Sequence, residues 1–173
     1  KLAGAARLMA VTTDIVRTWR GPRAVMRDLL AQGQREDRAL AYLMAACIII
    51  FIAQWPRLSR LAAGFENTSG EAPELSQLMA YEFMGWLIVW PLMFYVIALV
   101  AHMIAKILRG HGTAYGARLA LFWTLLATTP MALLYGLMAG FLGPSPGTNF
   151  VGAVWLIAFA VIWFQCQREA SAA

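Results

Sequence analysis

The residues that could do acid, base or metal chemistry are few and far apart. Glu82 and His102 lie on one predicted helix, 20 residues apart, which is about 30 Å along a helix axis. His111 falls in a predicted loop. No two histidines have the i, i+4 spacing of a helical metal site, and no nucleophile, dinucleotide or phosphate-loop motif is present. The pattern favours a protein that is not an enzyme, with no catalytic residue and no metal, haem or other cofactor.

The two cysteines also give little indication of chemistry. Cys47 and Cys166 each lie in or at the end of an apolar stretch, and neither belongs to a CxxC motif. We interpret both as buried thiols. A redox pair and a palmitoylation site are the alternatives.

Composition indicates what kind of protein positions these residues. Apolar types (AVILMFWYC) make up 61% of the 173 residues and charged types 13%, with a mean hydropathy of +0.63. A soluble domain has about 45–50% apolar and about 25% charged residues. The composition therefore excludes an ordinary cytosolic enzyme, a disordered protein and a disulfide-rich secreted module. The net charge of +5 lies mostly beside apolar runs, so it indicates membrane topology rather than nucleic-acid binding.

Four apolar runs are long enough to predict transmembrane helices, because a hydrocarbon core of about 30 Å needs roughly 20 helical residues. The predicted fold class is all-α, a polytopic transmembrane helical bundle. Pro56 is expected to end the first span. The bundle covers 39–166 with spans at about 39–55, 83–108, 117–142 and 150–165, and 167–173 form a tail.

The third span carries its own break and a packing signal. Pro130 removes a backbone N–H, and Thr128 and Thr129 can satisfy the freed carbonyls. We favour one kinked span over a re-entrant hairpin, because each half is too short to cross alone. Gly136 and Gly140 form a small-xxx-small pair that lets another helix approach closely. Chance placement in a glycine-rich span is the alternative.

The charged residues predict an orientation. The segments before the first span and between the second and third are basic, the first-to-second loop is acidic, and the third-to-fourth loop is uncharged. By the positive-inside tendency, both termini are cytoplasmic. We therefore predict an integral membrane protein with this orientation.

Residues 1–38 are predicted to form a separate cytoplasmic or interfacial amphipathic segment. Pro22 suits the first position of a helix and Gly33 its end. A basic amphipathic helix with a tryptophan is typical of the membrane surface. Packing on the cytoplasmic end of the bundle and docking of a partner are the alternatives. The predicted surface or partner contacts are Trp19, Arg17, Arg20, Arg23 and Arg27.

Three stretches together suggest a family. They are WRGPR at Trp19–Arg23, IAKILRGHGT at Ile104–Thr113, and a third span that opens YGARLA and carries TTP at its middle. From about Ile15 to Phe164 this order resembles the bacterial branch of the YIP1 family of polytopic membrane proteins. The resemblance implies a helical membrane fold located in the bacterial inner membrane, without an assigned activity. Eukaryotic relatives are implicated in membrane traffic and contact Rab-type GTPases, and no functional residue is carried over from them.

Three functions remain open. The first is a non-enzymatic YIP1-like scaffold or adaptor that acts through helix–helix and membrane-surface contacts. The second is an accessory subunit of a larger respiratory or photosynthetic complex, and the third is a small transporter or channel protomer. The expected partners are the lipid bilayer and other membrane-protein subunits, and not nucleic acid.

Overall fold

The computed structural model describes residues 2–65 and 74–172, with side chains from Val11 onward. The regular structure in these ranges is helical throughout. Three helices are long and apolar enough to cross a membrane, or four if one bent helix pair counts as a single span. The predicted all-α, membrane-spanning fold class is confirmed.

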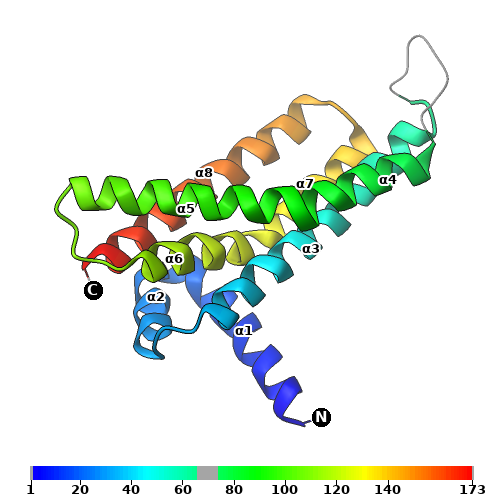
Figure 1. The fold of residues 1–173 in the computed structure, drawn as a ribbon. Helices are drawn as coiled ribbons and strands as arrows, with labels where there is room; N and C mark the ends of the chain where they lie inside the picture. The colour runs from blue at the N-terminus through cyan, green and yellow to red at the C-terminus, as the bar shows by residue number, and fades with distance from the viewer. Residues whose placement is uncertain (1, 66–73, 173) are drawn as a thin grey trace.

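The helices form a bundle with a hairpin packed on its side (Figure 1). The hairpin consists of α1 (Leu2–Arg20) and α2 (Pro22–Ala31). Helices α3 and α7 lie side by side, and α5 and α8 each contact α6. The bundle comprises α3 (Glu36–Ala62), α4 (Leu75–Met84), the π-helical turn η1 (Gly85–Val89), α5 (Trp90–Ile107), α6 (Ala114–Ala127), α7 (Thr129–Leu142) and α8 (Pro146–Ala172).

Helix α6 is the centre of the molecule. It contacts α1, α3, α5 and α8, and every side chain from Leu119 to Thr129 is buried. A helix that is apolar on all sides is expected to be enclosed in this way. Phe122 and Trp123 of α6 make edge-to-face contacts with Tyr95 of α5 and Tyr42 of α3, respectively.

The π-helical turn interrupts the second long helix just before a proline. The N–H of Trp90 donates to the carbonyl of Gly85, five residues back. Pro91 has no N–H, and its ring crowds the carbonyl four residues earlier. A wider turn at this point relieves the crowding. The stretch Leu75–Ile107 still forms one helix of 33 residues, about 50 Å long.

The helices extend beyond the apolar runs. Pro56 lies inside α3, which continues to Ala62, so the prediction that it ends the first span is wrong. Gly140 of α7 packs directly against Pro56. The helix that contains the second predicted span begins at Leu75, before residue 83, and α8 continues through the predicted tail as far as Ala172. Hydropathy detects only the part of a helix that matches the hydrocarbon core.

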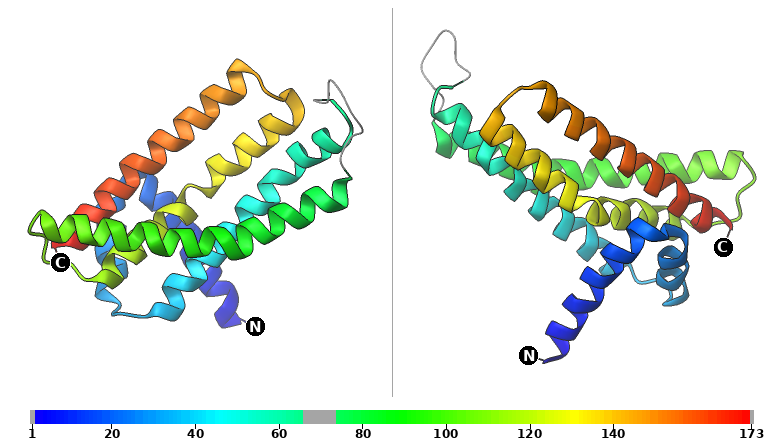
Figure 2. Two further views of the ribbon diagram at one scale, coloured as in Figure 1. Left: turned by 45° about the horizontal axis from the view of Figure 1, so that its top comes forward. Right: turned by 180° about the vertical axis from the view of Figure 1, so that it is seen from behind.

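The ends of α2 agree with the sequence analysis, and the helix packs on the bundle. Pro22 is its first residue, and Gly33 follows its end with φ +86°, a conformation that favours glycine. Val25, Met26 and Leu29 are buried, and α2 contacts α8. The apolar face of α2 is therefore covered by protein, while α1 projects away from the bundle toward the N-terminus (Figure 2).

Candidate interaction site

The helical pattern of backbone hydrogen bonds is interrupted where α6 meets α7, and the two helices are inclined by 45°. Pro130 cannot donate to the carbonyl of Leu126. The hydroxyl of Thr129 donates to that carbonyl instead, at 2.8 Å. The hydroxyl of Thr128 donates to the carbonyl of Leu125 at 3.2 Å and to that of Thr124 at 3.0 Å, and the Thr124 carbonyl also accepts from the N–H of Thr128. The predicted role at this break is therefore confirmed for Thr129.

A second carbonyl at the break, that of Ala127, is satisfied by α1. The N–H of Met131 donates to Thr128 at 3.1 Å, so Ala127 has no helical donor. The indole Nε1 of Trp19 donates to it at 3.0 Å. A buried carbonyl left unpaired would cost about 1–3 kcal/mol. Trp19, predicted as a surface contact, therefore also anchors α1, while 42% of the residue stays exposed.

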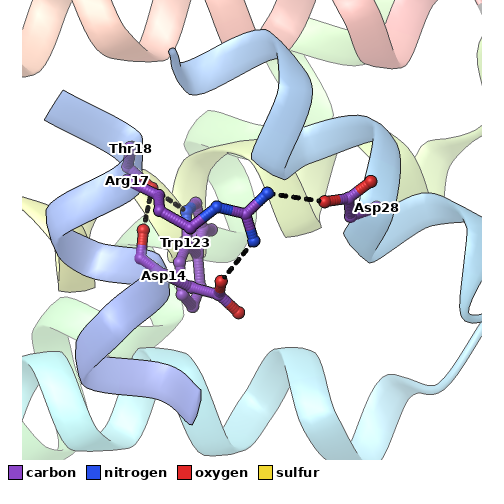
Figure 3. Close-up of polar contacts among 5 residues, drawn as sticks. All are labelled: Asp14, Arg17, Thr18, Asp28 and Trp123. Atoms are coloured by element: carbon purple, nitrogen blue, oxygen red, sulfur yellow. Dashed lines mark hydrogen bonds and ion pairs between the residues drawn. The ribbon is translucent and has the colours of Figure 1, made fainter. Parts of the chain in front are cut away.

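A second tryptophan makes the reverse connection, from α6 to α1 (Figure 3). The indole Nε1 of Trp123 donates to the hydroxyl of Thr18 at 3.0 Å, and this hydroxyl donates to the carbonyl of Asp14 at 2.7 Å. Both Thr18 and Trp123 are fully buried. We call the paired contacts Trp19–Ala127 and Trp123–Thr18 the tryptophan clamp. Sequence reasoning missed Thr18, because one threonine in a basic amphipathic helix gives no distinctive signal.

Two of the four predicted surface arginines hold the hairpin in place. Arg17 pairs with Asp28 of α2 at 3.1 Å and with Asp14 at 2.9 Å (Figure 3). These two hydrogen bonds raise the pKa of Arg17, and the bond to Asp28 has the larger effect. Arg27 pairs with Glu169 of α8 at 2.9 Å, and the hydrogen bond to Glu169 raises its pKa. These pairs connect α1 to α2 and α2 to α8.

The other two arginines face outward. Arg20 and Arg23 flank the turn between α1 and α2, and both are exposed. No acidic side chain in the described ranges pairs with either of them. The partly exposed indole of Trp19 is next to Arg20 in the chain. The predicted contact set therefore divides into Arg17 and Arg27, which act within the protein, and Arg20, Arg23 and Trp19, which offer an outer surface.

The predicted packing residues lie where α7 crosses α3. A Cβ atom added to Gly136 would overlap the carbonyl of Ala53, and one added to Gly140 would overlap Pro56. The close approach is thus made within this chain. Pro130, which we grouped with these two glycines as a packing residue, lies in the first turn of α7 with its side chain exposed. Its effect is to remove one backbone hydrogen bond from the helix.

The residues with acid, base or thiol chemistry are not gathered into one site. Glu82 lies in α4, His102 in α5, and His111 in the loop that follows. Within residues 2–65 and 74–172, no three His, Cys, Asp or Glu side chains come together as metal ligands. Cys47 and Cys166 are free and buried, as expected.

A groove of about 940 Å³ runs between α5 and α8. Its walls are mainly apolar, and Arg168 and Gln167 bring polar groups to it. The α5–α6 loop closes one end, because the N–H groups of His111 and Gly112 donate to the carbonyl of Ser171 at 3.0 and 3.2 Å. Sequence reasoning did not find this groove, because its walls come from two spans that are separate in the chain.

The chain matches no family model, and neither the curated proteins nor the solved structures provide a match. The likeness to the YIP1 family therefore depends on the sequence stretches quoted above.

Proposed function

We propose that this chain is a non-enzymatic scaffold or adaptor of the bacterial inner membrane, similar to YIP1 proteins. The observation that carries the proposal is the α1–α2 hairpin, whose base is locked to the bundle while Arg20, Arg23 and part of Trp19 stay outside. An exposed aromatic side chain beside two arginines that pair with no acidic side chain of the described residues suits anionic headgroups or an acidic partner surface.

Rigid attachment supports this proposal. A contact surface that is already ordered loses less conformational entropy when it binds. The tryptophan clamp and the ion pairs of Arg17 and Arg27 order the base of the hairpin. Helix α1 then projects from this base (Figure 2) and could present its length to a membrane surface or a partner.

The charge distribution supports a cytoplasmic position for the hairpin. Arg27 lies against the end of α8 through Glu169, and Arg118 pairs with Glu36 at the start of α3. These contacts gather the basic hairpin, the start of α3 and the end of α8 at one end of the bundle, where Lys106 of α5 also lies. By the positive-inside tendency, this end is the cytoplasmic one.

A matched pair of double variants tests the proposal. R20Q/R23Q and R17Q/R27Q remove the same charge, but only the second breaks the ion pairs of the hairpin. The full chain is extracted from native membranes into lipid-retaining nanodiscs, and the co-purifying proteins are identified by mass spectrometry. We expect R20Q/R23Q to lose the partner at unchanged thermal stability, whereas R17Q/R27Q lowers the stability of the hairpin.

The remaining outcomes decide against the proposal. If both variants recover the same proteins in the same amounts as the original chain, the hairpin is not the contact surface. A stoichiometric complex that is retained by both variants would instead identify an accessory subunit. A homo-oligomer that conducts solutes through vesicles would identify a transporter or channel protomer.

A further inference from the structure

The groove between α5 and α8 has the length of one membrane leaflet. Its walls run from Val96 to Leu108 and from Ala160 to Ala172, about 18 Å each at the helical rise. Half of a typical hydrocarbon core is about 15 Å. A transmembrane helix from a partner would need a surface about twice as long, so the length fits an acyl chain better.

The closed end of the groove lies at the charged boundary of the bundle. Lys106 and Arg109 are exposed at the end of α5, and the loop after them holds the end of α8 through Ser171. The wall of α5 is apolar from Val96 to Ala105. A chain lying in the groove would therefore have its polar end beside these basic residues and its apolar end toward the middle of the bundle.

Arg168 supplies a positive charge within the groove. Its guanidinium carbon lies 5.7 Å from the centre of the Phe164 ring, and both residues line the groove. No acidic side chain of the described ranges pairs with Arg168, whereas the neighbouring Glu169 is paired with Arg27. A guanidinium group that is not engaged by a carboxylate can bind a phosphate through two parallel hydrogen bonds.

We propose that this groove binds one anionic glycerophospholipid of the surrounding membrane. Its phosphate pairs with Arg168, and one acyl chain lies along the apolar walls. Basic pockets between transmembrane helices are a known arrangement for anionic headgroups. This goes beyond the scaffold function and involves none of the outward residues of the hairpin.

Native mass spectrometry of the full chain tests the proposal. The protein is reconstituted in vesicles of equal parts phosphatidylglycerol and phosphatidylcholine, extracted mildly, and the lipids retained per chain are counted. We expect one retained phosphatidylglycerol. Arg168→Gln should lower its retention about fivefold relative to the original chain, and Arg168→Lys should lower it less. Ala160→Trp, which fills the groove without changing charge, should abolish retention of either lipid.

Arg57→Gln is the matched control, because it removes an exposed arginine of α3 outside the groove. It should retain phosphatidylglycerol like the original chain. Equal retention of the two lipids by the original chain would overturn the proposal, as would unchanged retention in Ala160→Trp. Disulfide or photochemical capture of a protein helix in the groove would also overturn it. If Arg168→Gln does not fold, Ala160→Trp and the lipid preference of the original chain decide the result.

Discussion

The indole Nε1 of Trp19 donates to the carbonyl of Ala127 at 3.0 Å, across 108 positions of the chain. Ala127 is the last residue of α6, and its carbonyl has lost its helical donor at the break before α7. The bond therefore satisfies a defect in the central helix with a side chain from the first helix. It makes the position of α1 and the geometry of the break depend on each other.

Replacing Trp19 by Phe should destabilise the protein. The substitution keeps an aromatic ring but leaves the buried carbonyl of Ala127 unpaired, at a cost of about 1–3 kcal/mol. Trp55→Phe is the matched control, because Trp55 is similarly exposed, at 45% against 42% for Trp19. The thermal midpoint in a mild detergent measures both. Equal shifts for the two variants would show that the hydrogen bond of Trp19 adds nothing.

The hydroxyl of Thr129 should matter only while residue 130 is a proline. Thr129→Val removes the donor to Leu126 and should cost about 1 kcal/mol. In a Pro130→Ala background, the new N–H can donate to Leu126, so the same change should cost less than about 0.5 kcal/mol. Unfolding free energies of the four proteins in this double-mutant cycle give the coupling. A coupling of zero would mean that Thr129 does not replace the missing proline donor.

Two glycine-to-alanine changes in helices should have opposite effects. Gly136→Ala adds a methyl group that overlaps the carbonyl of Ala53, and it should destabilise the α3–α7 contact by about 1–3 kcal/mol or more. Gly85→Ala adds the same group where no atom lies within 4 Å, and it should be neutral or stabilise by up to about 1 kcal/mol. Thermal unfolding distinguishes them. Similar midpoints for both variants would contradict the close packing.

Cysteine labelling should report the orientation of the bundle. Cys47 and Cys166 are buried, so the native protein should react slowly with a maleimide. Ser76→Cys and His111→Cys each introduce a thiol at an exposed position, near opposite ends of the long helix Leu75–Ile107. In intact cells, a membrane-impermeant maleimide should label only Cys at position 76, and lysis should expose position 111. Labelling of position 111 before lysis would reverse the orientation.

The sequence predicted those features that depend on local pattern. The apolar runs identified the spanning helices, Pro22 and Gly33 the bounds of α2, and the Thr128–Pro130 stretch the break. Each of these depends on the type of a residue and its neighbours along the chain. The break was visible because proline always removes a donor, whatever surrounds it.

The features that depend on tertiary contacts could not be predicted from the sequence alone. Pro56 lies inside α3, where Gly140 of α7 packs on it, and α6 is enclosed because four other helices surround it. The difference between the arginines that form ion pairs and those that face outward also depends on tertiary contacts. Arg17 and Arg27 resemble Arg20 and Arg23 in the sequence, and only the positions of Asp28 and Glu169 in space separate them.

The central position of α6 has a consequence for biosynthesis. Among the helices that enclose it, α1, α3 and α5 precede it in the chain, and α8 follows it. Trp19 and Thr18 are therefore already available when the break emerges from the ribosome, whereas the face of α6 toward α8 stays uncovered until the last helix is made. A chaperone or insertase that shields helices during insertion would be needed most during this interval.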